Sequence, residues 1–221
     1  MKTIIITGGT SGIGFDIANF FYKKKYNISI AGVLTKPQLL KLKKTFSVNQ
    51  SLILSLDLIK KNNIKKFVNL TKKKFKNIDI LVNCAGKQHV SPICKFSDKI
   101  WEYIININLN TPFKMIKEVL PIMRKNKWGR IINISSAHGV VASHFKAAYV
   151  SSKHGLVGLT KVVALETAKE KITCNAIGPG FVDTELVRKQ IKDLAFKKSI
   201  SFKKAKDLSL IHISEPTRQE A

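Results

Sequence analysis

Short apolar runs alternate along this chain with longer segments in which apolar residues recur every three or four positions. The runs are rich in β-branched residues, which is typical of buried strands. They lie at residues 3–6, 27–31, 52–56, 79–83, 130–134 and 172–177. The intervening segments have helical periodicity; in one of them Ile64, Phe67, Val68 and Phe75 mark a single face. This alternation predicts an α/β fold, a doubly wound parallel sheet in a single domain with helices on both faces.

One predicted helix, residues 101–126, contains asparagines at positions 106, 108 and 110 and a proline at 112. Asparagine is a mediocre helix former, and proline removes a backbone donor. We therefore expect a long helix with a local distortion near Asn108.

Polar or glycine residues directly follow several of the predicted strands. The segment 7–14 follows the first strand, Asp57 the third, Asn83 the fourth and Ser136 the fifth. In open parallel sheets, ligands bind beyond the carboxyl ends of the strands. These positions are therefore predicted to form one site.

The segment Thr7–Gly14 stands between a predicted strand and a predicted helix. Glycines let the backbone approach a ligand closely, and a helix N-terminus offers free N–H groups to an anion such as a pyrophosphate. The spacing of Gly8, Gly12 and Gly14 differs from the GxGxxG pattern, but its position between strand and helix still favours nucleotide binding.

The second strand is followed by residues 32–36, GVLTK, which contain no acidic residue. Dinucleotide enzymes usually place a carboxylate there to bind the adenosine ribose. The residues alone therefore leave the choice between NAD and NADP open, and Lys36 could favour a 2′-phosphate.

Three reactive side chains lie in the segment 135–153. Tyr149 and Lys153 are one helical turn apart and share a face. A phenol normally ionises near pH ~10, and a neighbouring ammonium group favours the phenolate. Ser136, at the end of an apolar run, can reach the same reacting oxygen. The pattern predicts acid/base chemistry on a hydroxyl or carbonyl group.

Composition narrows the class of protein. The chain has 221 residues, 44% of them hydrophobic, which suits one globular domain. No apolar run approaches the ~20 residues of a membrane span, and we recognise no signal peptide. The three cysteines have no metal-binding spacing, so we expect no metal site and a reducing, cytoplasmic location.

The formal net charge is +25, and only four of the 39 basic residues are arginine. Many lysines fall on polar helix faces, such as those at 41–44 and 72–74. We interpret this as compositional bias and do not expect nucleic-acid binding, which favours clustered basic residues.

Six motifs occur in one order: TGGTSGIG at 7–14, NCAG at 83–86, Asn108, Ser136, YVSSK at 149–153 and PGFVDT at 179–184. Over residues 3–190, their order and spacing resemble the short-chain dehydrogenase/reductase family. The resemblance implies a Rossmann-like fold, a nicotinamide dinucleotide cofactor, reversible hydride transfer and usually a homo-tetramer.

The resemblance also implies roles for individual residues. Tyr149 would be the general acid/base, Lys153 would lower its pKa and hold the nicotinamide ribose, and Ser136 would bind the substrate oxygen. Asn108 would position a water molecule linked to Lys153. The implied cofactor-binding residues are Gly8, Thr10, Ser11, Gly12, Ile13, Gly14, Asp57, Asn83, Ala85, Gly86, Tyr149, Lys153, Pro179, Gly180, Val182 and Thr184.

Four further polar residues, Gln88, His138, Lys146 and Gln190, are expected around the catalytic groups. One cation with several hydrogen-bonding groups suits a small carboxylate substrate. The surrounding segments resemble bacterial members of the family that oxidise (R)-3-hydroxybutyrate to acetoacetate with NAD, which is our leading expectation. Two alternatives are a 3-oxoacyl thioester or sugar reductase using NADP, and an inactive basic fragment.

The resemblance ends near residue 205, and residues 207–221 read DLSLIHISEPTRQEA. We therefore expect residues 1–205 to form an incomplete domain without the family's last strand and helix. Residues 206–221 are expected to be an unstructured, non-native tail resembling a translated vector junction. The strand at 172–177 would then be an exposed edge, with weak NAD binding, aggregation or inactivity as consequences.

Overall fold

A computed structural model of the chain describes residues 1–180, 182 and 185–207. Its centre is a parallel sheet of six strands in the order β3-β2-β1-β4-β5-β6. The strands are β1 (Thr3–Thr7), β2 (Asn27–Gly32), β3 (Ser51–Ser55), β4 (Ile80–Asn83), β5 (Gly129–Ile134) and β6 (Ile172–Ile177). This order reverses direction between β1 and β4, as in the doubly wound nucleotide-binding folds, so the predicted fold class is confirmed.

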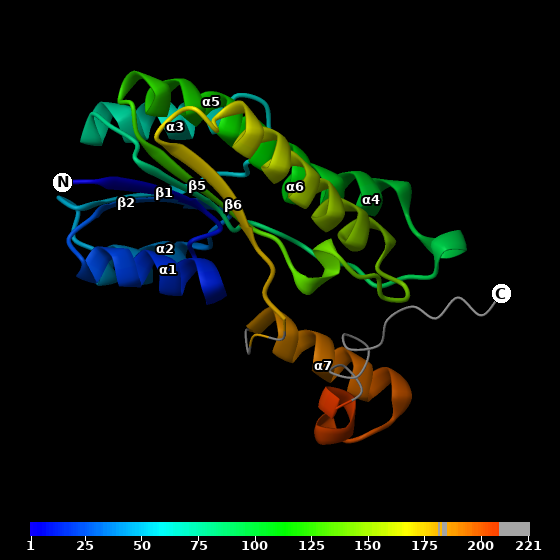
Figure 1. The fold of residues 1–221 in the computed structure, drawn as a ribbon. Helices are drawn as coiled ribbons and strands as arrows, with labels where there is room; N and C mark the ends of the chain where they lie inside the picture. The colour runs from blue at the N-terminus through cyan, green and yellow to red at the C-terminus, as the bar shows by residue number, and fades with distance from the viewer. Residues whose placement is uncertain (181, 183–184, 208–221) are drawn as a thin grey trace.

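Helices cover both faces of the sheet (Figure 1). One layer contains α1 (Gly12–Lys23) and α2 (Lys36–Thr45). The opposite layer contains α3 (Asn63–Phe75), α5 (Thr111–Lys125) and α6 (Ala147–Glu166). Side chains of a strand alternate between faces, so Ile5 joins the core under α3 and α5, whereas Ile4 and Ile6 join the core under α1.

The predicted helix at 101–126 is helical throughout but is not uniform. It consists of α4 (Asp98–Ile105), a π-helical turn at Asn106–Asn110 and α5. Pro112 stands in the first turn of α5, where its missing N–H is tolerated. The π turn includes Asn108, so the expected distortion is found at the expected residue.

Two short 3₁₀ turns, Ile93–Lys95 and Ala137–Gly139, lie in loops, and α7 (Glu185–Lys198) follows β6. A further helical segment covers 202–207. Residues 206 and 207, which we expected to be unstructured, therefore lie in a helix. The rest of the predicted tail, 208–221, lies outside the described residues.

The strand β6 pairs with β5 through six residue pairs, from Gly129–Ile172 to Ile134–Ile177. Among the residues that the structure describes, no strand pairs with its other side. Thr173 and Asn175, which alternate with the buried Ile172 and Cys174, are exposed. The expected exposed edge is therefore present in the described part of the chain.

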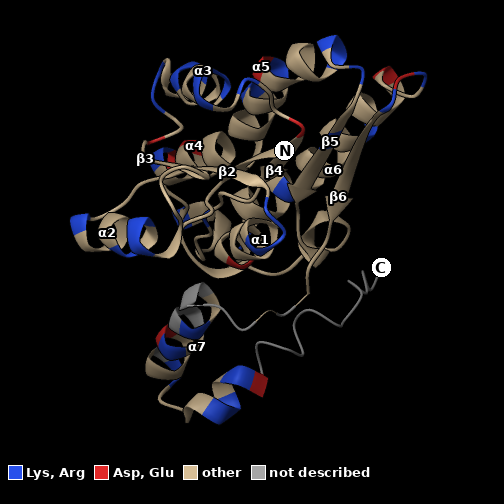
Figure 2. Cartoon of the chain, turned by 90° about the vertical axis from the view of Figure 1, so that its left-hand side faces the viewer, with Lys and Arg blue, Asp and Glu red and all other residues tan. Residues whose placement is uncertain are grey.

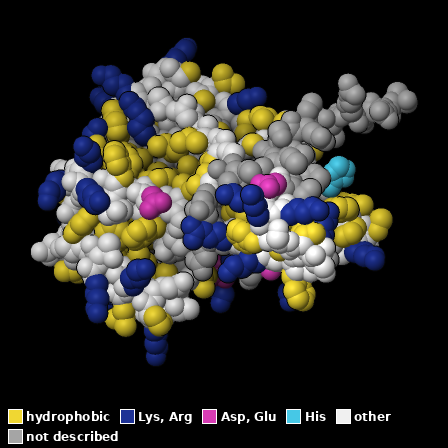
Figure 3. Space-filling model, turned by 90° about the horizontal axis from the view of Figure 1, so that it is seen from below, with side chains coloured by type: hydrophobic (Ala, Val, Ile, Leu, Met, Phe, Trp, Pro, Cys, Tyr) yellow, Lys and Arg dark blue, Asp and Glu magenta, His cyan; other side chains and the backbone are white. Residues whose placement is uncertain are grey.

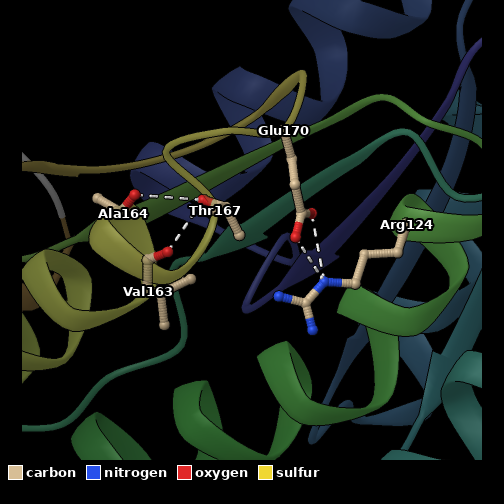
Figure 4. Close-up of polar contacts among 5 residues, drawn as sticks. All are labelled: Arg124, Val163, Ala164, Thr167 and Glu170. Atoms are coloured by element: carbon tan, nitrogen blue, oxygen red, sulfur yellow. Dashed lines mark hydrogen bonds and ion pairs between the residues drawn. The ribbon is translucent and has the colours of Figure 1, made fainter.

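A polar contact joins the C-terminal end of α5 to the turn that follows α6 (Figure 4). The Arg124 guanidinium of α5 donates to Glu170 at 3.0 Å, and Thr167 Oγ1 donates to the Val163 carbonyl at 2.9 Å. The Arg124–Glu170 pair is partly exposed to solvent. Such surface pairs stabilise by only about 0–1 kcal/mol, so the apolar core is the main source of stability.

Lysine and arginine side chains are spread over the surface seen from the side of α1, α2 and α7, with apolar side chains between them (Figure 3). None of the described helices is both long and apolar enough to span a membrane. Cys84, Cys94 and Cys174 are free thiols.

Candidate active site

The loop after β1 is clamped against the loop after β4. Thr7 Oγ1 accepts hydrogen bonds from the backbone N–H groups of Cys84 at 3.1 Å and Ala85 at 3.2 Å. Gly8 has φ +71°, and a Cβ on it would lie 2.7 Å from Ala85 Cα. Only glycine fits this close approach. Thr7 is therefore a positioning residue that the sequence analysis did not assign to the site, although it opens the motif at 7–14.

The N-terminus of α1 fits an anion. Its N-cap, Ser11, makes no side-chain hydrogen bond to the helix, and the first turn contains no acidic residue. The first N–H groups of a helix lack intrahelical partners, and here no side chain caps them. A Cβ on Gly14 would lie 2.4 Å from the Gly8 carbonyl oxygen, so the loop can wrap tightly around this end. The geometry fits the predicted pyrophosphate site.

The remaining residues of this loop lie close to the end of β2. Gly12 has φ +50°, and Thr10 and Ile13 are half-buried. A Cβ on Gly32 would lie 3.2 Å from Thr10 Cγ2. Beyond Gly32 the chain is exposed at Val33 and Lys36, so a ribose near this strand end would meet no carboxylate from residues 32–36.

The predicted cofactor residues after β3 and β4 differ in how they are placed. The carboxylate of Asp57 accepts from the Ile59 N–H at 3.1 Å and is half-buried. Asn83 is 2% exposed, and its Nδ2 donates to Asn133 Oδ1 of β5 at 2.8 Å. Its side chain thus lies within the sheet, which leaves its main chain to face a ligand. Ala85 is half-buried and Gly86 is exposed.

Tyr149 and Lys153 lie on one face of α6, as predicted. Lys153 Nζ donates to the Ile134 carbonyl at the end of β5, at 2.8 Å, and lies 5.5 Å from the centroid of the Tyr149 ring. Ser135 supports the same junction, because its Oγ donates to the Lys153 carbonyl at 3.3 Å. The ammonium group is therefore fixed between strand and helix.

Burial dominates the proton affinities of this pair. Desolvation lowers the pKa of Lys153 to about 8, although Cys84 acts in the opposite direction. Desolvation also raises the pKa of Tyr149, and a hydrogen bond with Ser136 only partly offsets this. Burial therefore raises the phenol pKa on balance, and a lowering contribution from Lys153 stays a prediction.

Ser136 and His138 form a compact polar turn beside Tyr149. Ser136 Oγ accepts from the His138 N–H at 3.2 Å and lies 3.4 Å from His138 Nδ1. The imidazole packs edge-on against the Tyr149 ring, with centroids 5.9 Å apart. His138 is 5% exposed, and its Nε2 is buried without a partner among the described residues. An unpaired buried nitrogen beside the catalytic tyrosine suits a ligand contact.

The pKa of His138 falls to about 4, first because of burial and then because of Lys146 and His154 nearby. The imidazole is therefore neutral at physiological pH. Lys146 stands just before α6 and is half-buried, and burial lowers its pKa as well. Lys146 is thus near enough to His138 to act on its pKa, and the substrate-binding role of both residues stays a prediction.

Gln88, on the loop after β4, is half-buried. The backbone of Gln190 is part of α7, whereas its side chain lies outside the described parts of the chain. The predicted role of Gln190 remains a prediction from the sequence.

Asn108 connects three elements. Its Oδ1 accepts from the Lys87 N–H at 2.9 Å, and its Nδ2 donates to the Lys87 carbonyl at 2.9 Å and to Ser152 Oγ at 3.0 Å. Ser152 Oγ in turn donates to the Tyr149 carbonyl at 2.7 Å. Asn108 therefore links the π turn, the loop after β4 and the catalytic helix.

Lys87 and Ser152 were not predicted as site residues. Lys87 acts through its backbone, which no residue pattern reveals. Ser152 directly precedes Lys153 and could have been found only from its place on the buried side of the helix.

The loop after β6 lies beside the Ser136 turn. The Pro179 carbonyl accepts from the Ala137 N–H at 2.9 Å, and a Cβ on Gly178 would lie 3.2 Å from the Ser136 carbonyl oxygen. Gly180 and Val182 are exposed. Thr184 lies outside the described residues. The described part of this motif thus borders the catalytic groups.

Among the residues that the structure describes, no group of three or more His, Cys, Asp or Glu side chains could hold a metal ion.

Comparison with known proteins agrees with this geometry. The sequence pattern of the short chain dehydrogenase family matches residues 2–195. The chain belongs to the short-chain dehydrogenase family. It is 43% identical to D-beta-hydroxybutyrate dehydrogenase of Rhizobium meliloti over 203 residues, which cover 90% of this chain and 79% of that protein.

Two further relatives show the breadth of the similarity. The D-beta-hydroxybutyrate dehydrogenase of Cupriavidus necator is 42% identical over 209 residues, covering 93% of this chain and 80% of that one. The 3-oxoacyl-[acyl-carrier-protein] reductase FabG of Buchnera aphidicola subsp. Schizaphis graminum is 35% identical over 201 residues, covering 90% and 81%.

Solved structures of similar fold include an actinorhodin polyketide ketoreductase with NADPH, with a TM-score of 0.86 and 29% identity over 92% of this chain and 79% of that one. A 4-hydroxyisoleucine dehydrogenase complexed with NADH has a TM-score of 0.75 and 31% identity over 88% and 82%. The chain is thus an oxidoreductase whose structural relatives bind either nicotinamide nucleotide.

Proposed function

We propose that this oxidoreductase is an NAD-dependent 3-hydroxybutyrate dehydrogenase, which oxidises (R)-3-hydroxybutyrate to acetoacetate reversibly. The observation that carries the proposal is the pairing of a neutral, buried His138 with the half-buried Lys146 beside Tyr149. One cation and one hydrogen-bonding nitrogen next to the acid/base match a short carboxylate with a hydroxyl on its third carbon. The names of the two most similar relatives reported above support the same substrate.

Tyr149 acts as the base in the oxidative direction. Its phenolate removes the proton of the substrate hydroxyl while the hydrogen on the same carbon leaves with two electrons as hydride. When bound, the oxidised nicotinamide supplies the hydride acceptor. Ser136 donates a hydrogen bond to the substrate oxygen and stabilises its alkoxide character. In the reverse direction Tyr149 returns the proton to the carbonyl oxygen.

Lys153 holds positive charge next to the phenolate when it is protonated. With its pKa at about 8, a large part of Lys153 is protonated at neutral pH. The ammonium favours the ionised tyrosine at the moment of proton transfer and offsets part of the burial penalty. Asn108 supports this arrangement indirectly: its side chain donates to the Ser152 hydroxyl, which donates to the Tyr149 carbonyl.

The dinucleotide would be held along the carboxyl ends of the strands. The N-terminus of α1, with Gly8, Ser11 and Gly12, would hold the pyrophosphate. Asp57 and the main chain of Asn83 would lie along the adenosine side, and Lys153 with Pro179 and Val182 along the nicotinamide side. The lack of an acid at residues 32–36 does not exclude NAD, because other strand ends can contact the ribose.

Lys146 and His138 would orient the substrate carboxylate. Burial lowers the pKa of Lys146, and an incoming carboxylate would counteract this and favour the charged form that binds it. The neutral His138 adds a directional contact through Nε2 without a second positive charge.

The competing candidate is a 3-oxoacyl thioester reductase using NADPH, which the similarity to the Buchnera FabG favours. A sugar reductase and an inactive basic fragment are the other possibilities. These candidates are distinguished by measuring the formation of the reduced cofactor through its absorbance. The purified chain is mixed with (R)- or (S)-3-hydroxybutyrate and with NAD or NADP, and an acetoacetyl thioester is tested in the reductive direction with NADH or NADPH.

The proposal requires turnover of the (R)-enantiomer with NAD and at least tenfold less with NADP. Tyr149→Phe sets the background, because general acid/base groups contribute typically ~10²–10⁴-fold in rate. Turnover of the thioester with NADPH alone would establish the reductase instead. Absence of every activity, with cofactor binding measured separately by fluorescence, would establish the inactive fragment.

We further propose a homo-tetramer in a reducing, cytoplasmic environment. Apolar side chains on the outer faces of α5 and α6, Phe113 at 49%, Val162 at 52% and Leu165 at 77% exposure, support association through these helices. Light scattering coupled to size-exclusion chromatography measures the mass directly. A monomer at micromolar concentration would exclude this assembly.

A further inference from the structure

Four turns carry the chain from a helix into β2, β4, β5 and β6. In a parallel sheet, such turns all lie at the amino ends of the strands, opposite the end that bears the catalytic groups. Figure 2 faces this end of the molecule and shows basic residues around it. The exposed lysines of these turns include Lys24, Lys25, Lys76, Lys127, Lys169 and Lys171. We call them the turn lysines.

Three of the turn lysines adopt a backbone conformation that disfavours lysine. Lys25, Lys76 and Lys127 have φ of 64°, 66° and 53°. This left-handed region brings Cβ close to a carbonyl oxygen, so glycine or asparagine normally occupies it. The three lysines adopt this left-handed conformation because each of them stands where a helix ends.

Two of these helix ends form the same hydrogen-bonded motif. After α1, Tyr26 N–H donates to the Phe21 carbonyl at 3.0 Å and Lys25 N–H to the Tyr22 carbonyl at 2.9 Å. After α5, Trp128 N–H donates to the Met123 carbonyl at 3.2 Å and Lys127 N–H to the Arg124 carbonyl at 3.0 Å. This is the Schellman motif, in which the left-handed residue is usually glycine.

Compositional bias alone does not explain the three lysines. Asparagine is also frequent in this chain and tolerates the left-handed conformation, as Asn62 does with φ 67° at the start of α3. Lysine in these turns therefore carries a conformational penalty that asparagine would avoid. The helix dipole offsets part of that penalty, because a cation at a helix C-terminus is favourable, and a polyanionic partner would offset the rest.

The acidic residues in the same turns do not neutralise the turn lysines, because their carboxylates have other partners. Asp79 is 8% exposed and accepts hydrogen bonds from Thr3 N–H and Asn77 Nδ2. Glu170 is paired with Arg124. Within the described part of the chain, none of the turn lysines forms a salt bridge.

We propose that this end of the molecule binds the sugar-phosphate backbone of nucleic acids through the turn lysines, without sequence preference. The large total number of lysines indicates compositional bias. The placement of three turn lysines in a backbone conformation that disfavours lysine, all at one end of the molecule, instead indicates a polyanionic ligand. Lysine ammonium groups contact phosphates as point charges and read no base edges.

A nucleic acid fits this surface better than a membrane does. Peripheral membrane binding uses a helix that lies flat with an apolar face in the bilayer, whereas this surface consists of turns. It also carries an aromatic and cationic group, because Lys2 Nζ lies 3.6 Å and Arg130 Cζ 4.5 Å from the centroid of the Trp128 ring. Guanidinium and aromatic planes are common stacking partners of nucleic-acid bases.

The test uses the full chain and a variant with Lys25→Asn, Lys76→Asn and Lys127→Asn. Asparagine suits the left-handed conformation and removes the charge. A matched control, Lys95→Gln, Lys114→Gln and Lys117→Gln, removes three exposed charges elsewhere. Binding of a fluorescent ~20-base-pair DNA duplex is followed by anisotropy at several salt concentrations, because non-specific sites bind at ~10⁻⁴–10⁻⁶ M near physiological salt.

The proposal predicts that the log–log salt slope decreases by about 2.7 in the asparagine variant, since each duplex phosphate contact contributes about 0.9. The control is expected to change the slope by less than half as much. Thermal unfolding supplies the second readout: Tm should rise by roughly 2–4 °C for each relieved position. A more stable protein that binds less tightly cannot be explained by misfolding.

Three outcomes would overturn the proposal. Equal losses in the two variants would show that net charge alone drives binding. A dissociation constant of the wild type for the duplex above ~10⁻³ M at ~150 mM salt would show that the proposed interaction does not exist. Tighter binding to vesicles of anionic lipid than to the duplex would assign the surface to a membrane instead.

Discussion

The Asn108 side chain donates a hydrogen bond to the Ser152 hydroxyl at 3.0 Å, and the Ser152 hydroxyl in turn donates to the Tyr149 carbonyl at 2.7 Å. This relay couples a π-helical turn to the helix that bears the acid/base. Both N–H groups of the Asn108 amide and one lone pair of its Oδ1 are engaged by Lys87 and Ser152, so we expect it to act on catalysis through the position of α6. A displacement of about 1 Å at a reacting group can cost roughly 10²-fold in rate.

Replacing Ser152 with alanine is therefore expected to lower kcat about tenfold while KM for the hydroxy acid changes little. The change removes one of the two acceptors of Asn108 Nδ2 and leaves one of its buried N–H groups unpaired. Ser151→Ala, on the exposed side of the same helix, is the matched control. Steady-state kinetics with thermal unfolding of both variants measures the effect. A loss of Tm with unchanged kcat would show that Ser152 is structural only.

Removal of the Lys146 cation should weaken substrate binding. Lys146→Ala is expected to raise KM for 3-hydroxybutyrate about 10–100-fold with kcat nearly unchanged, because a charge-assisted contact contributes about 1.5–3 kcal/mol. Lys161→Ala, an exposed lysine of α6, is the control. An unchanged KM would place the carboxylate elsewhere and favour a substrate without one.

The stability contribution of Lys153 should depend on pH in the alkaline range. Its pKa is about 8 in the folded chain and 10.5 in its unperturbed form. Between these values the unfolded chain binds more protons, so this residue's contribution to stability rises with pH across that window. Below pH 8 the penalty for the buried ammonium is fully present.

Lys153→Met should abolish turnover and change this pH dependence. Relative to wild type, the variant is expected to lose about 2 kcal/mol of stability between pH 8 and 10, because wild type gains that amount and methionine does not. Denaturant titrations at several pH values measure the difference, with Lys161→Met as the control. A constant difference between variant and wild type would contradict a lowered pKa of Lys153.

His138 should make the protein sensitive to mild acid. Its folded pKa of about 4 lies below the unperturbed 6.5, so the unfolded chain binds more protons between these values. Stability from this residue is therefore complete above pH 6.5 and is lost as the pH falls towards 4.

The variant His138→Gln should flatten this acid limb of the stability profile, whereas His144→Gln, at an exposed position, should not. Thermal unfolding from pH 4 to 7 tests it. If both variants follow the wild-type curve, the imidazole is not held neutral by burial.

The sequence predicted the sheet, its strands and the meeting of Ser136, Tyr149 and Lys153, because apolar periodicity and the four-residue helical repeat are local properties. It also located the distortion at Asn108. It did not predict the balance of pKa effects at Tyr149, since that depends on desolvation by residues distant in the chain. The roles of Thr7, Lys87 and Ser152 were missed because they depend on hydrogen bonds between segments distant in the chain.

The distribution of lysines also has a consequence for handling the enzyme on surfaces. Lys153 is 5% exposed and Lys146 is half-buried, whereas the turn lysines stand open at the far end of the sheet. Amine-reactive supports that couple to the turn lysines hold the molecule by that end. Immobilised in this way, the molecule presents its catalytic end outward to the solution.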